Sequence, residues 1–311
     1  MTYSNRAHAS AKAIGASLDD LLGPASERYL ATRFRDVART FVGSATPSSE
    51  RRITLDGRAA LRYPDAWTVK RSSRPAPHFS SIDAVVLVET VCAHFAERDE
   101  DSSASPPRLR SISLRAGTSA DVELEGIPVA GTLDAPPSRT GMDARLTLGA
   151  MRAVAQLDHP PAFPHETPAE GAPLPLELAA DGAGEHVWRS HLIRMDIGRS
   201  IEFRHEIVST GDPAARRAVT VLDLLRLSAQ QAQALIYFSD GLDRASANSI
   251  WMRSASFDVG EREPLDAPLL LEVSITRTQR IDRASVRWNV FDVVAQGTGD
   301  LRASASLAYA R

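Results

Sequence analysis

The amino-acid sequence predicts an α+β protein of two similar halves, in each of which an antiparallel sheet curls around one long helix. Three observations favour this fold class. Residues 78–98, HFSSIDAVVLVETVCAHFAER, read as a helix that is apolar nearly all the way round, and residues 220–244, TVLDLLRLSAQQAQALIYFSDGLDR, repeat its layout. Each is followed by segments in which apolar and polar residues alternate, as in half-buried strands. A helix enclosed by a sheet is dry on most sides, which explains the missing polar face.

Each helix is predicted to begin at a hydroxyl cap. Ser80 stands three residues before Asp83, and Thr220 three residues before Asp223, which is the spacing of a capping side chain and an acidic residue that bonds back to it. The carboxylates also lie at the positive end of the helix dipole. Capping alone would account for both aspartates, at about 1 kcal/mol each, so a purely structural role stays open.

The strands are predicted around these helices. After the first helix come LRSISLRAG, DVELEGIPVAG and DARLTLGAM, and after the second come MRSASFDVG, LLLEVSITRT, SVRWNVFDVVAQG and DLRASASLAYA. In the last two, side chains of one face recur at every second residue, among them Val286, Trp288 and Val290. Because LRSISLRAG and MRSASFDVG occupy the same place in the repeat, Arg110 corresponds to Arg253.

Prolines mark the expected boundary between the halves. Six of them fall between Pro160 and Pro175, where they can continue neither a helix nor a central strand. We therefore expect an N-terminal half over residues 1–160, a proline-rich linker over 161–176 and a C-terminal half over 177–311.

The composition narrows the function classes. A net charge of -3 gives no basic surface for nucleic acid, and no apolar stretch approaches the roughly 18 residues of a membrane span. Cys92, the single cysteine, lies in the apolar helix and is expected to be a small buried residue. The first 17 residues are typical of a frayed tail rather than of a signal peptide. We expect a cytoplasmic protein without metal or nucleotide.

Ionisable residues at the two helix starts are the candidate catalytic groups. His78 is the predicted acid or base, together with Asp83 and Asp223, because short turns could bring these groups into one pocket. His205, on a probable strand, is the second choice. A histidine before a helix is more often a surface residue, and that alternative stays open.

Four residues are candidates for substrate binding. Gln230 and Thr90 lie seven residues beyond Asp223 and Asp83, on the same helix stripe, so Gln230 needs a partner from the sheet or from a ligand. Trp251 and Arg253 share one side of a predicted strand and could bind an anionic ligand. A core tryptophan beside a surface arginine explains them equally well.

The segments LGPASERYL, LRYPDAWTVK, HFSSIDAVVLVETV and LDGLDRASANSIWMR resemble the avirulence D protein family of bacterial elicitor biosynthesis. The doubled helix and sheet are similar to the double hot-dog fold of acyl-thioester enzymes. The resemblance implies an enzyme that joins a β-ketoacyl thioester, carried by acyl carrier protein or coenzyme A, to a small ketose-like acceptor, with no further cofactor. By analogy with dehydratases of this fold, His78, Asp83 and Asp223 would form the acid and base groups, although the glycine-bearing histidine motif of those enzymes is missing.

Two alternatives remain at this point. The first is a dehydratase or thioesterase that acts on the same acyl carriers. The second is a non-catalytic module that binds an acyl ligand, and pairing of two chains into a homodimer is compatible with each. The sequence contains neither a GxSxG motif nor a cysteine in a nucleophilic setting, so no covalent intermediate is expected.

Overall fold

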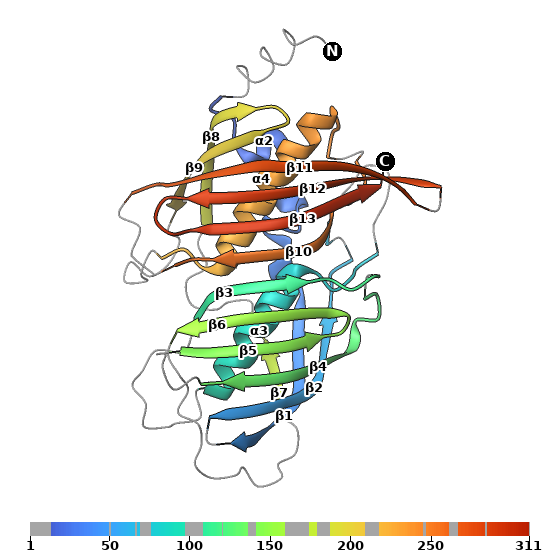
Figure 1. The fold of residues 1–311 in the computed structure, drawn as a ribbon, viewed down its shortest axis with the longest axis vertical. Helices are drawn as coiled ribbons and strands as arrows, with labels where there is room; N and C mark the ends of the chain where they lie inside the picture. Colours follow the sequence, from blue (N-terminus) through green and yellow to red (C-terminus); the bar gives the residue numbers. More distant parts are fainter. Residues whose placement is uncertain are drawn as a thin grey trace. The chain divides into compact units, whose positions relative to one another are not determined.

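A computed structural model describes most of the chain (Figure 1). The described residues are 14–49, 51–65, 67–68, 76–96, 108–119, 121–135, 141–158, 174–178, 187–208, 218–244, 247–260, 267–283 and 285–310. They contain antiparallel strands and few helices, as the sequence predicted. No helix within these residues is both long and apolar enough to span a membrane.

The chain divides into two compact units. Of the described residues, 35–65 and 76–178 form the N-terminal unit, whereas 14–34, 67–68 and 187–310 form the C-terminal unit. This differs from the expected division at 160 and 177, because residues 14–34 pack with the C-terminal half and residues 174–178 pair with the N-terminal half. Residues 161–173 of the expected linker lie outside the described residues.

The N-terminal unit contains seven strands and one long helix. In chain order its elements are β1 (Ala38–Ser49), β2 (Arg52–Arg62), α3 (Ser81–Ala96), β3 (Arg108–Arg115), β4 (Glu125–Asp134), β5 (Gly141–Leu148), β6 (Met151–Asp158) and β7 (Leu174–Leu178). The antiparallel strands follow the order β7-β1-β2-β4-β5-β6-β3. α3 packs against β3, β5, β6 and β7, and all its residues from Ile82 to Val88 are buried.

The C-terminal unit contains six strands. Its elements are α2 (Leu18–Leu22), the short 3-10 helix η1 (Ala25–Glu27), β8 (Val187–Asp196), β9 (Ser200–Val208), α4 (Val221–Asp240), β10 (Trp251–Asp258), β11 (Leu269–Arg283), β12 (Val286–Gly297) and β13 (Arg302–Ala310). A second 3-10 helix, η2 (Arg33–Asp36), follows η1 at the boundary between the units. The strands follow the order β8-β9-β11-β12-β13-β10, and α4 packs against β9, β10, β11 and β13.

The two units share one topology, which confirms the internal repeat. In each, two strands precede the long helix and four follow it in the shared topology, β3–β6 in one unit and β10–β13 in the other. The first strand after the helix, β3 or β10, pairs with the last strand of the unit, β6 or β13. The remaining strands pair in the same order in both units. β7 is an addition to the N-terminal unit, where it pairs with β1.

One predicted strand face is corrected. In β12 the buried side chains are Asn289, Phe291, Val293 and Ala295, on the face opposite to Val286, Trp288 and Val290. The alternation favoured the wrong face because Asn289 is polar. Its amide nitrogen donates to Asp240 Oδ2 at 2.9 Å and to the Tyr309 hydroxyl at 3.0 Å, which compensates the burial of that end only, because Oδ1 has no partner among the described residues.

Candidate functional site

The start of α3 is closed by the predicted capping box. The Ser80 hydroxyl accepts from the backbone amide of Asp83 at 3.3 Å, and Asp83 Oδ2 accepts from the backbone amide of Ser80 at 3.0 Å. The backbone N–H groups of Ser81 and Ile82, in the first turn, bond neither a carbonyl within the helix nor the capping side chain. This end of α3 therefore combines a buried carboxylate with backbone donors.

The Asp83 carboxylate is held by two residues from neighbouring segments. Arg39 on β1 donates to Oδ1 through Nε at 3.0 Å and Nη2 at 2.7 Å, and both side chains are buried. The Tyr63 hydroxyl bonds the other oxygen, Oδ2. With the Ser80 hydroxyl also donating at 2.6 Å, both carboxylate oxygens are engaged. Such a carboxylate is suited to holding neighbouring groups in place.

His78 is linked to this carboxylate through Tyr63. The Tyr63 hydroxyl lies 2.8 Å from the backbone carbonyl of His78 as well as beside Asp83. The half-buried imidazole bonds the Ala76 carbonyl through Nδ1 at 3.3 Å. Because a carbonyl oxygen only accepts, Nδ1–H is the donor in this contact, and in that neutral tautomer Nε2 is the nitrogen that can accept a proton. Tyr63 thus connects His78 to Asp83, and the sequence analysis did not predict this role of Tyr63.

The start of α4 repeats the arrangement with different partners. The Thr220 hydroxyl accepts from the Asp223 amide at 3.0 Å, and Asp223 Oδ2 accepts from the Thr220 amide at 3.2 Å. Trp188 on β8 donates its indole N–H to Asp223 Oδ1 at 2.9 Å. Arg226 lies 3.7 Å from the same oxygen. In each unit, therefore, the first strand supplies a donor to the helix aspartate.

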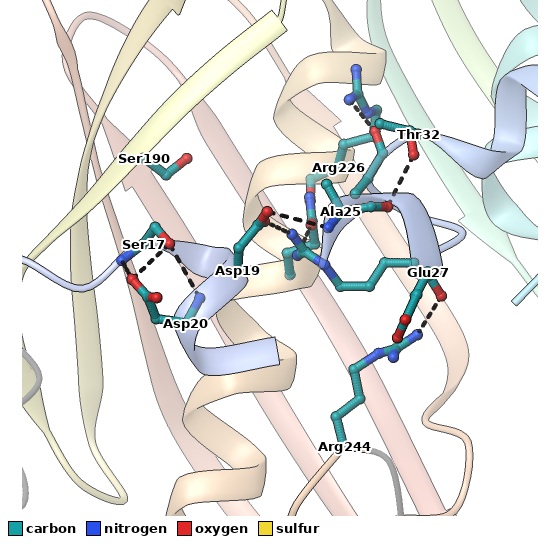
Figure 2. Close-up of polar contacts among 12 residues, drawn as sticks. Ser17, Asp19, Asp20, Ala25, Glu27, Thr32, Ser190, Arg226 and Arg244 are labelled. Carbon is teal, nitrogen blue, oxygen red and sulfur yellow. Dashed lines mark hydrogen bonds and ion pairs between the residues drawn. The ribbon is translucent and has the colours of Figure 1, made fainter. Parts of the chain in front are cut away.

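Residues 14–34, the N-terminal segment, cover the polar stripe of α4 (Figure 2). Arg28 donates to Gln230 Oε1 and to Asp19, and Gln230 in turn donates to the Arg226 carbonyl at 2.9 Å. Arg226 donates to the carbonyl of Ala31 at 2.5 Å. The partner of Gln230 is thus Arg28 of the N-terminal segment, which the sequence analysis did not single out and which lies beyond the expected tail of 17 residues.

A capping signal could have identified this segment. Ser17 and Asp20 form a complete capping box at the start of α2, and the bond to Ser17 lowers the pKa of Asp20. Within this cover, burial lowers the pKa of Arg28 to about 10, although Asp19 opposes the shift. Arg28 still carries its charge at neutral pH, so the contact between the N-terminal segment and α4 depends on a charged side chain.

The other predicted binding residues, Thr90, Trp251 and Arg253, have different surroundings from Gln230. Thr90 bonds the Val86 carbonyl of its own helix at 2.8 Å. Trp251 and Arg253 are exposed on β10, where a β-bulge at Arg253 interrupts the pairing with β13. β3 has the corresponding bulge at Arg110, where it pairs with β6. A bulge ends strict alternation, so the shared face expected for Trp251 and Arg253 does not follow from their spacing.

Two further side chains bear on the chemistry. Cys92 is buried as expected, and burial raises the pKa of its thiol, which removes it as a ready nucleophile. His205, the second candidate histidine, is completely buried on β9, and burial lowers its pKa to about 3. Within the described residues, no three His, Cys, Asp or Glu side chains are grouped to hold a metal ion.

Comparison with known proteins identifies the family. The sequence model described as Pseudomonas avirulence D protein (AvrD) matches residues 13–176 and 204–310. The chain belongs to this family. No curated protein sequence matches the AvrD chain.

Several solved structures are similar to this AvrD protein at low sequence identity. A tesB protein of Mycobacterium avium subs paratuberculosis is 12% identical, with 86% of this chain and 96% of that chain covered and a TM-score of 0.38. The 12:0-ACP thioesterase from Umbellularia californica is 11% identical, with 78% and 91% covered and a TM-score of 0.42. The pyran synthase domain from module nine of the sorangicin pathway is 14% identical, with 87% and 97% covered and a TM-score of 0.41.

Proposed function

We propose that this AvrD protein is a tandem hot-dog enzyme that joins a β-ketoacyl thioester to a small hydroxylated acceptor. One observation carries the proposal: His78 stands at the start of α3, and its backbone carbonyl bonds the Tyr63 hydroxyl that also contacts the buried Asp83 carboxylate. Family membership and the repeated unit of antiparallel strands with one long helix support it. The thioester would arrive on acyl carrier protein or coenzyme A.

In this mechanism Nε2 of His78 is the general base. It takes the proton from the acceptor hydroxyl while that oxygen attacks the thioester carbonyl. The amides of Ser81 and Ile82, at the positive end of α3, stabilise the negative charge on the carbonyl oxygen. The carbon–sulfur bond then breaks, and the imidazolium returns its proton to the leaving thiolate. The products are an ester and a free thiol, so atoms and protons balance without a covalent enzyme intermediate.

The two aspartates act by position in this proposal. The single proton of the Tyr63 hydroxyl is shared between the Asp83 carboxylate and the His78 carbonyl, which keeps these two groups close together. Asp223 is assigned the equivalent task at the start of α4, where its charge is balanced by Arg226. Removal of either carboxylate should lower kcat more than it raises KM, because the substrate does not touch it.

Product masses test the reaction. The purified protein is incubated with a β-ketoacyl thioester, with and without a ketose, and the products are weighed. A new mass that requires the ketose supports the proposal, whereas hydrolysis alone makes the protein a thioesterase and overturns it. Incubation with a 3-hydroxyacyl thioester tests dehydration, which loss of one water would reveal.

His78→Gln tests the assigned base. This variant should lower kcat by at least a hundredfold, since general bases contribute about 10²- to 10⁴-fold. His191→Gln, at a half-buried histidine of β8, is the matched control and should retain the rate. Equal rates in the two variants would exclude His78 as the base.

A further inference from the structure

A chain of three buried polar side chains joins α4 to the first hairpin of the C-terminal unit. The Ser190 hydroxyl on β8 lies 2.7 Å from His205 Nδ1, and Gln231 Nε2 on α4 lies 2.6 Å from His205 Nε2. His205 and Gln231 have no exposed surface, and Ser190 is 7% exposed. The imidazole also stacks on Phe203 at a centroid distance of 5.8 Å. All these contacts lie within one unit.

The N-terminal unit fills the same three positions with apolar residues. Phe41 pairs with Ala59 across β1 and β2 as Ser190 pairs with His205 across β8 and β9. Arg39 and Trp188, two residues earlier on these first strands, both donate to the helix aspartate, which fixes the correspondence. Val91 stands eight residues after Asp83, as Gln231 does after Asp223. Phe41, Ala59 and Val91 are all buried.

This difference between the copies argues against a purely structural role. The same strand order and capped helix form around an apolar trio in one unit, so the fold does not require the polar trio. Replacing both partners of a buried hydrogen bond by apolar groups is often neutral or stabilising. Stability of the fold therefore does not explain why these three buried side chains are polar.

One end of the Gln231 amide points to a ligand. Among the described residues, Gln231 Oε1 is buried and has no hydrogen-bond partner. The contact with His205 uses only the nitrogen end of the amide. The oxygen end of this fully buried side chain is left over, which is unfavourable unless something else bonds it.

We propose that Ser190, His205 and Gln231 form a binding site for a neutral hydroxyl group of a ligand. A hydroxyl can donate its proton to Gln231 Oε1, the end of the amide that is left over. Because His205 stays neutral in its buried position, none of the three side chains would compensate a charge on the ligand, and a charged ligand group would lose its hydration without replacement. Ser190, the only partly exposed member of the three, marks the side from which the site is reached.

The source of the hydroxyl rests on the proposed function. It belongs either to the ketose-like acceptor or to a hydroxylated acyl chain. Dihydroxyacetone, the smallest ketose, probes the first source. The pair of 3-hydroxyoctanoyl and octanoyl thioesters of N-acetylcysteamine, which differ by one hydroxyl, probes the second.

Calorimetric binding to variants of the full chain tests the site. Gln231→Met removes the amide at similar length. The triple variant S190F/H205A/Q231V installs the trio of the N-terminal unit. Ser228→Ala is the control, because Ser228 is a buried α4 residue whose hydroxyl bonds the Leu224 carbonyl of its own helix at 2.6 Å.

Both test variants should bind a hydroxylated probe roughly tenfold more weakly than the wild type, the loss of one buried hydrogen bond. Binding of the octanoyl thioester should not change, and Ser228→Ala should match the wild type. Loss for dihydroxyacetone alone identifies the acceptor as the source, and loss for the 3-hydroxyoctanoyl thioester alone identifies the acyl chain.

Three results would overturn the site: equal binding by wild type and variants, no preference of the wild type for any hydroxylated probe, or unfolding of both test variants at 25 °C. The last would make the trio structural. Because binding needs no turnover, hydroxyl discrimination without any condensation product would refute the proposed function and leave the site intact.

Discussion

The buried imidazole of His205 should make the folded protein sensitive to mild acid. Burial lowers its pKa from 6.5 to about 3 in the folded state, while the unfolded chain retains the ordinary value near 6.5. Between these values the unfolded state binds a proton that the folded state does not. Stability is therefore fully present above pH 6.5 and is lost as the pH falls toward 3.

The size of the effect follows from the two pKa values. Integrated from pH 7 to pH 5, a single group with these pKa values removes about 2 kcal/mol from the free energy of unfolding. This window lies above the ordinary titration of carboxyl groups. The other histidines are common to wild type and variant, so their contribution cancels in a difference.

Urea unfolding at pH 7, 6 and 5 measures the effect in the wild type and in S190F/H205A/Q231V. The wild type should lose about 2 kcal/mol more than the variant over this range, with the steeper part between pH 6 and 5. Parallel pH profiles would show that His205 titrates normally and reaches solvent. That result would refute the description of His205 as a dry, neutral side chain.

Three further perturbations have defined expectations. Asp83→Asn should lower the free energy of unfolding by about 3–5 kcal/mol, because it leaves the Arg39 guanidinium buried without its counter-charge; a loss below 1 kcal/mol in urea would contradict that pairing. Gln230→Met should speed hydrogen exchange of the α2 amides, because it removes the bond from Arg28 that ties the N-terminal segment to α4; unchanged exchange would show that this bond does not hold the segment. Gly241→Ala should cost about 1 kcal/mol in thermal unfolding, because Gly241 ends α4 in the left-handed region at φ 65°, and an unchanged melting temperature would contradict this.

Local features of the sequence predicted the helices and their starts. The hydroxyl and the aspartate three residues later form a capping box at both α3 and α4. The burial of Gln230 also followed from its place on the stripe of Asp223. These inferences need only helical periodicity, which is a property of neighbouring residues. The repeat itself was visible for the same reason.

The partners of those residues could not be predicted in the same way. Arg39 reaches Asp83 from another strand, and Arg28 reaches Gln230 from 202 residues earlier in the chain. Such contacts depend on strand register and on how a loop crosses a helix, and no local pattern encodes either. The N-terminal segment was not predicted, although Ser17 and Asp20 have the same capping spacing as the starts of the two long helices.

The internal repeat separates structural from functional polar residues. Asp83 and Asp223 recur in both copies, and each completes a capping box that any such helix would gain from. Their recurrence is therefore explained without catalysis. His78 differs, because the position five residues before Asp223 is Ala218, a buried residue of the second copy. A histidine present in one copy and replaced by alanine in the other is not needed to start the helix. This asymmetry is what favours His78 over either aspartate as the group that moves a proton.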